Sequence, residues 1–300
     1  MAIRRGPLAA PDDATKVFKV DNGDGSSIPA WSSGFPVDMA IERAVNATDN
    51  TRISSRLTGT GFMYTDTNDP EYTNQYREFD YMDGWWSQVK NSPDYSWMWK
   101  RAPSYFDVVA TKSTNGNVNH NLGVAAEMVW YKRRDSADDW FVCTAANGYL
   151  KLNSTASSFG SGNGSYLTNA YGAQVTSTTV HTGYNFTGVT TADMIIYLFA
   201  TAAGVSKVGS YTGNGSSQNI DCGFSSGARF ILIKSATDAG SWFVHDSVRG
   251  IVAGNDPRLK LDQNQAEMSA DYVDPLSSGF TVNGPGNNDN GQTYIFYAIA

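Results

Sequence analysis

The sequence predicts an all-β fold with little helix, organised as three tandem antiparallel β-sandwich repeats of jelly-roll-like type. Composition gives the first support. The 300 residues include 29 Gly, 16 Tyr, 14 Phe and 8 Trp, whereas charged residues make up only 17%. This mixture suits short aromatic strands joined by tight polar turns. Because 41% of the residues are hydrophobic, the chain can build real cores and should be folded.

Internal repetition gives the second support. Residues 17–35, 106–124 and 205–224 each contain a strand, a glycine-containing turn, a second short strand and a glycine followed by an apolar residue. The glycines are Gly34, Gly123 and Gly223, which lie 89 and 100 residues apart. A period of that length is one small domain. We therefore expect an N-terminal arm (1–16), a diverged first repeat (17–104) and two further repeats (105–204 and 205–300).

The remaining strands follow in the same order in each repeat. An apolar strand comes first, then DDWFVCTA (138–145) or its close match GSWFVHDS (240–247), for which TRISSRL (51–57) is the diverged counterpart. Alternating strands at 149–155 and 258–264 come next, and an aromatic strand closes each repeat. The alternation predicts half-buried strands with one face in a core. Four tryptophans in these strands should be core residues: Trp97, Trp99, Trp140 and Trp242.

Charge and hydropathy exclude several classes of partner. The net charge is −7 and no segment is strongly basic, so we expect no nucleic acid partner. No apolar run approaches the roughly 18 residues of a membrane span, so we expect no membrane insertion. The N-terminus has no apolar run typical of a secretory signal, which points to synthesis in a cytoplasm. Cys143 and Cys222 lack metal-site spacing, which disfavours structural zinc and leaves a disulfide open.

Catalytic motifs are not evident. The carboxylate pair Asp138 and Asp139 is the best candidate for glycosidase chemistry, but such residues in polar loops are usually turn formers. The chain also lacks a nucleophile elbow and histidine metal motifs. We therefore predict no catalytic residues, no metal and no cofactor, although the oxygen-rich turns at 21–25, 65–70 and 288–291 leave calcium as a weaker alternative.

Two groups of side chains are candidates for other roles. Asp246 and Arg249 lie three residues apart at a strand end and should form an ion pair that fixes a turn. The second group consists of aromatic residues in loop-like segments, expected to be exposed and to contact a ligand or a neighbouring subunit: Trp31, Trp85, Trp86, Tyr72 and Tyr76. Aromatic faces in loops stack on sugar rings or become buried at interfaces, and we favour the interface.

Several strings point to a known family. GNVNHNLGVAAEMVWYKRRD, AGVSKVGSYTGNGSS, DSVRGIVAGNDP and TYIFYAIA resemble repeat modules of predicted virion and tail-fibre-like structural proteins of marine bacteriophages of the cyanophage and pelagiphage type. The resemblance covers about 17–300. It implies a non-enzymatic virion component, assembled in the host cytoplasm, with other virion subunits as partners and a homo-oligomeric state within the particle.

The resemblance leaves the position in the particle open. One role is a tail-associated, fibre-like adhesive subunit that contacts a host surface glycan or protein. The alternative is a capsid decoration (cement) or connector protein with a purely architectural role, and a polysaccharide-degrading appendage enzyme is a distant third. The first repeat departs most from the pattern, because it lacks the WFV strand and carries an acidic, aromatic segment at 67–86. We expect a distinctive interaction surface there.

Overall fold

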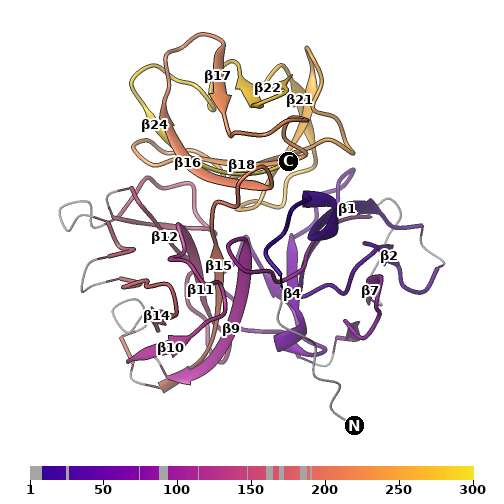
Figure 1. Cartoon of the computed structure of the whole chain (residues 1–300), viewed down its shortest axis with the longest axis vertical. Helices are drawn as coiled ribbons and strands as arrows, with labels where there is room; N and C mark the ends of the chain where they lie inside the picture. The colour runs from indigo at the N-terminus through magenta and orange to yellow at the C-terminus, as the bar shows by residue number, and fades with distance from the viewer. Residues whose placement is uncertain are drawn as a thin grey trace.

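The chain folds into three lobes arranged around a common centre (Figure 1). In this computed structural model, the described residues are 9–24, 27–73, 75–87, 94–113, 115–146, 148–159, 165–168, 172–182, 188–189 and 191–300. We call the lobes lobe 1 (β1 to β8), lobe 2 (β9 to β15) and lobe 3 (β16 to β24), after the strands that they contain.

Each lobe is built on one main antiparallel sheet. The strand orders are β1-β8-β3-β4-β5 in lobe 1, β9-β15-β11-β12-β13 in lobe 2 and β16-β24-β18-β19-β20-β21 in lobe 3. The first and last long strands of each lobe are therefore neighbours, and the next hairpin extends the sheet. The prediction of an all-β, antiparallel fold with little helix is confirmed. The equivalent strand orders support three copies of one module, while the exact repeat boundaries stay a prediction.

The main sheets contain the longer strands. In lobe 1 these are β1 (Phe18–Asn22), β3 (Met39–Ala44), β4 (Arg52–Ser55), β5 (Met63–Tyr64) and β8 (Asp94–Trp99). In lobe 2 they are β9 (Phe106–Ser113), β11 (Met128–Arg133), β12 (Phe141–Thr144), β13 (Tyr149–Lys151) and β15 (Thr191–Phe199). In lobe 3 they are β16 (Ser206–Thr212), β18 (Phe230–Ser235), β19 (Phe243–Asp246), β20 (Asp256–Lys260), β21 (Met268–Ala270) and β24 (Thr293–Ile299).

A smaller sheet covers the outer face of each main sheet, which makes every lobe sandwich-like. The order is β2-β7-β6 in lobe 1, β10-β14 in lobe 2 and β17-β23-β22 in lobe 3. The strands are β2 (Trp31–Ser32), β6 (Arg77–Glu78), β7 (Gly84–Ser87), β10 (Asn117–Asn119), β14 (Thr179–His181), β17 (Gln218–Asp221), β22 (Val273–Leu276) and β23 (Gly279–Val282).

The central strands of the main sheets are buried on both faces. Every residue of β3 and β18 is buried, as are all but the last residue of β11. Half-burial was predicted from the alternating strands, and that pattern did not address these apolar strands. They are buried because one face contacts the smaller sheet and the other contacts the neighbouring lobes. Half-burial does hold for β13, in which only Leu150 is buried.

The three inner faces share one hydrophobic core. Trp97, Trp99, Trp140 and Trp242 all belong to it, as predicted, and none is more than 1% exposed. Aromatic rings also meet across lobe boundaries: Phe18 lies 5.3 Å from Phe230 and Phe199 lies 5.0 Å from Tyr297 between ring centroids. The lobes are therefore parts of one packed unit.

Helix is confined to two short 3-10 turns in the described part of the chain, η1 (Ala14–Lys16) and η2 (Arg56–Thr58). Residues 1–8 of the predicted N-terminal arm lie outside the part of the chain that the structure describes. Its end forms η1, for which the Asp13 side chain is the N-cap and accepts a hydrogen bond from the Thr15 amide. Among the described residues, no helix is long and apolar enough to cross a membrane.

Burial of the outer core of lobe 1 gives a stability prediction. Trp85 is fully buried, so Trp85→Ala removes a large side chain from a packed site and should lower the free energy of unfolding by about 3–5 kcal/mol. Tyr76 in the same lobe is 61% exposed and is the matched control. Tyr76→Ala should change the free energy of unfolding by less than about 0.5 kcal/mol. Urea denaturation measures both. Equal losses for the two variants would contradict the assigned burial.

Candidate functional site

Two of the aromatic candidates are core residues and not loop residues. Trp31 on β2 and Trp85 on β7 are fully buried and stack on each other, with ring centroids 4.8 Å apart. Trp31 Nε1 donates to the backbone oxygen of Asp94, and Trp85 Nε1 donates to Ser96 Oγ. The expected exposure of both residues was therefore wrong. Their short strands pair with each other and fill the space over the main sheet, which the Gly-rich, Pro-containing sequence around them concealed.

The other aromatic candidates reach the surface to different degrees. Trp86 is partly buried, Tyr72 is 39% exposed and Tyr76 is 61% exposed. Tyr72 is also held in place, because its ring stacks on Phe62 at 5.1 Å and its hydroxyl donates to Asp69. The structure therefore offers Tyr72 as a fixed surface ring and Tyr76 as the more exposed one.

A buried ion pair supports the ring of Tyr72 from behind. The guanidinium of Arg77 lies over Phe62, 4.6 Å from the ring centroid, and Arg77 Nη2 is 2.6 Å from Glu42 Oε1. Both charged side chains are at most 1% exposed. Burial raises the pKa of Glu42 to about 7 despite the neighbouring Arg77. The layered contact of Arg77, Phe62 and Tyr72 connects the surface of lobe 1 to its interior.

The first part of the acidic, aromatic segment contacts lobe 2. Glu71 forms an ion pair with Arg134, and its backbone amide donates to the Arg134 oxygen at 2.8 Å. The oxygen of Asn68 accepts from the Asp138 amide, also at 2.8 Å. We expected 67–86 to project as a binding surface, but residues 68–71 serve an internal contact.

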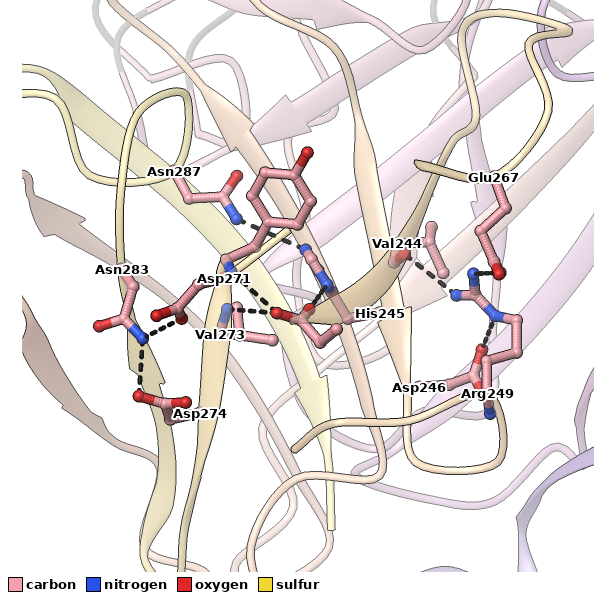
Figure 2. A network of polar contacts seen from close by, with 12 residues as sticks. Val244, His245, Asp246, Arg249, Glu267, Asp271, Val273, Asp274, Asn283 and Asn287 are labelled. Atoms are coloured by element: carbon pink, nitrogen blue, oxygen red, sulfur yellow. Dashed lines mark hydrogen bonds and ion pairs between the residues drawn. The ribbon is translucent and has the colours of Figure 1, made fainter. Parts of the chain in front are cut away.

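The predicted pair of Asp246 and Arg249 belongs to a larger network (Figure 2). Arg249 Nε donates to Asp246 Oδ2 at 2.6 Å, and its other nitrogens donate to Glu267 and to the Val244 oxygen. Asp246 Oδ1 accepts the backbone amides of the turn at 248 and 249. Trp97 of lobe 1 donates to Asp246 Oδ2 at 3.0 Å, so the pair also joins lobe 1 to lobe 3.

A second polar network lies beside it in lobe 3 (Figure 2). His245 Nδ1 is 2.9 Å from Asp256 Oδ2, and both side chains are fully buried. Asp256 Oδ1 accepts the amides of Tyr272 and Val273 at 2.8 and 3.1 Å. Burial lowers the pKa of His245, although Asp256 acts in the opposite direction. The neutral imidazole therefore donates to Asp256, and the carboxylate in turn holds the start of β22.

The other chemical candidates have local partners. Asp139 lies 2.6 Å from Lys151 Nζ and accepts from Asn153, while Asp138 Oδ1 accepts the Asp139 amide. Both therefore act as turn residues. Cys143 and Cys222 are buried free thiols. Within the described ranges, no group of three or more His, Cys, Asp or Glu side chains is placed to hold a metal ion.

Three buried cations occupy equivalent positions in the three main sheets. Arg43 on β3, Lys132 on β11 and Lys234 on β18 are at most 1% exposed. The registers place them opposite equivalent residues of the closing strands, which are Tyr95, Ile195 and Ile295. The signal in the sequence was a basic residue at the same place in three apolar strands, at Arg43, Lys132 and Lys234.

Each lysine joins its own lobe to the preceding one. Lys132 Nζ donates to the oxygens of Asn68 in lobe 1 and Asp138 in lobe 2. Lys234 Nζ likewise donates to the oxygens of Thr155 in lobe 2 and Gly240 in lobe 3. Burial lowers the pKa of both lysines to about 8. Because buried carbonyl oxygens need donors, the ammonium groups satisfy acceptors that water cannot reach.

Backbone hydrogen bonds repeat at all three lobe contacts. The amides of Asp138, Gly240 and Asp49 donate to the oxygens of Asn68, Thr155 and Asn264, at 2.8, 2.8 and 3.0 Å. Three residues further along the accepting segments, the amides of Glu71, Ser158 and Glu267 donate back to the oxygens of Arg134, Ala236 and Val45. The same contact thus connects lobe 1 to 2, lobe 2 to 3 and lobe 3 to 1, and the ring of lobes is closed.

A family model described as a domain of unknown function (DUF7483) matches residues 13–300. The chain belongs to the DUF7483 family. One family domain therefore spans all three lobes, in agreement with the shared core and the closed ring. A search of curated proteins finds no match.

In this DUF7483 protein, polar side chains and exposed apolar side chains are distributed differently. The buried charged side chains described above form their ion pairs and hydrogen bonds inside lobes or between lobes. The large apolar side chains that do reach solvent are concentrated in lobe 1. Among the described residues, five of the seven lie there, namely Ile28, Leu57, Tyr72, Tyr76 and Met82, whereas Val248 and Val252 lie in lobe 3.

The buried histidine gives a pH prediction. A His with a lowered folded pKa binds fewer protons in the folded state, so it contributes stability above pH 6.5 that is lost as the pH falls. His245→Gln should remove this pH-dependent contribution to the free energy of unfolding. The slope of the contribution can reach about 1.4 kcal/mol per pH unit. Urea denaturation of the DUF7483 protein between pH 7 and pH 5 measures the difference from wild type.

Asp256→Asn is the matched control for this prediction. It removes the carboxylate that favours the imidazolium, so the loss of stability towards acid should persist or become steeper. Identical slopes for wild type and His245→Gln would show that His245 does not titrate in the folded protein as described.

Proposed function

We propose that this DUF7483 protein is a bacteriophage virion structural protein, a tail-associated, fibre-like adhesive subunit that contacts the host surface through lobe 1. Its partners are other virion subunits, including further copies of the chain, and a host surface glycan or protein. The resemblance of residues 17–300 to virion modules supports the virion assignment.

The single observation that carries the choice of lobe 1 is its share of exposed apolar side chains. Large apolar groups at a surface are typical of binding sites when they gather in one region. Tyr72 is well suited to contact a partner, because Phe62 and Asp69 fix its ring and little side-chain entropy is lost on binding.

The alternative is a capsid decoration or connector protein. The burial of Trp31 and Trp85 favours it, since this burial removes two of the three indole rings that could have stacked on a sugar. A polysaccharide-degrading enzyme has the least support, because Asp138 and Asp139 are engaged in turn contacts.

Competition for the host surface tests the adhesive role. The purified protein at saturating concentration should block adsorption of a phage that carries this chain. Replacing Tyr72 and Tyr76 together by Ser should weaken the competition about tenfold, as expected for truncated interface anchors. The double replacement of Val248 and Val252 by Ser is the control on lobe 3 and should compete as wild type does.

Location in the particle separates the two roles. Density for the chain at the distal tail supports adhesion, whereas density over the capsid lattice supports decoration and removes the adhesive proposal. Failure of the wild-type protein to compete at saturation also counts against adhesion.

A further inference from the structure

The contact between lobes 3 and 1 has a side-chain chemistry that differs from the other two contacts. At the contacts between lobes 1 and 2 and between lobes 2 and 3, a tryptophan accompanies the buried lysine. Trp140 Nε1 donates to the Tyr64 oxygen at 2.8 Å, and Trp242 Nε1 donates to the Lys151 oxygen at 2.9 Å. At each of these contacts, a lysine and a tryptophan of one lobe therefore donate hydrogen bonds to backbone oxygens of the preceding lobe.

Lobe 1 has a threonine at the equivalent position. Thr51 directly precedes β4, as Trp140 precedes β12 and Trp242 precedes β19, and the strand pairings align these three positions. Thr51 is fully buried but is much smaller than an indole. Its hydroxyl accepts a hydrogen bond from Arg43 Nη1 at 2.9 Å.

Arg43 reaches the carbonyl oxygen that an indole would otherwise satisfy. Arg43 Nη1 donates to the Lys260 oxygen at 2.7 Å, and Lys260 is equivalent to Tyr64 and Lys151 in the strand pairings. The same guanidinium donates to the oxygens of Gln263 and Gln265. A planar group with five N–H donors can serve several carbonyls at once, which an ammonium group beside a threonine cannot do.

We infer that Arg43 and Thr51 are a co-adapted pair that performs, where lobe 3 meets lobe 1, the work that a lysine and a tryptophan share at the other two contacts. The larger cation occupies the space that the smaller neighbour leaves. Lobes 1 and 3 are not consecutive in the chain, and this contact joins them. The pair therefore determines how specifically lobe 1 binds to lobe 3. The surface that the pair contacts is the segment of lobe 3 from Lys260 to Gln265.

A double-mutant cycle in the full-length chain tests the pairing. Arg43→Lys alone should lower the urea midpoint, because the Lys260 oxygen loses its donor and a void remains. Thr51→Trp alone should also lower it, because the indole and the guanidinium compete for one space. The double variant should regain at least half of the summed loss, since an ammonium group and an indole together can reach the acceptors that Asn264 and Lys260 offer. Additive losses would overturn the inference.

The reciprocal exchange keeps the test decisive if Thr51→Trp fails to fold. Lys132→Arg and Trp140→Thr, made singly and together at the contact between lobes 1 and 2, should show the same non-additive recovery. Hydrogen exchange gives a local readout: protection of the Asp49 amide, which donates to Asn264, should fall in Arg43→Lys and return in the double variant. Unchanged Asp49 protection in Arg43→Lys would count against the pair.

Discussion

The burial of each main sheet on both of its faces is the constraint on which the rest of the structure depends. A sheet covered only by its smaller partner sheet could present polar residues on its other side. Here the other side forms a core shared by all three lobes, and the loops around that core carry carbonyl oxygens away from water. Buried acceptors without donors cost free energy, which explains why each sheet carries one long cation at its inner face. The cations are therefore a consequence of the shared core.

Much of the fold followed from pattern alone, because the features responsible are local. Short aromatic strands between polar turns predicted an antiparallel all-β fold, and the repeated WFV strand placed Trp140 and Trp242 in equivalent core positions. The alternation of Trp97, Met98 and Trp99 also predicted their faces correctly: the tryptophans belong to the shared core and Met98 to the outer core of lobe 1. These inferences needed only the period-two geometry of a strand.

The candidate surface was harder to predict, because exposure depends on what lies on top of a segment. Trp31 and Trp85 lie in two strands of two and four residues, too short for a periodic signal, and they are buried only because those strands pair and close over the sheet. The segment around Asn68 and Glu71 had the composition of a free loop, yet it contacts a lobe whose position no local pattern encodes. The basic residues within apolar strands were visible, and aligning the three copies would have identified them.

One core shared by three similar lobes has a consequence for cooperativity. In a chain of independent modules, each would unfold with its own transition, and damage to one would leave the others standing. In this protein, Phe18 and Trp99 of lobe 1 both contact Phe230 of lobe 3, and the last residues of β24 belong to the same aromatic cluster. Loss of any lobe exposes the inner faces of the other two. We therefore expect the three lobes to unfold together, so that a defect in any lobe becomes a defect of the whole.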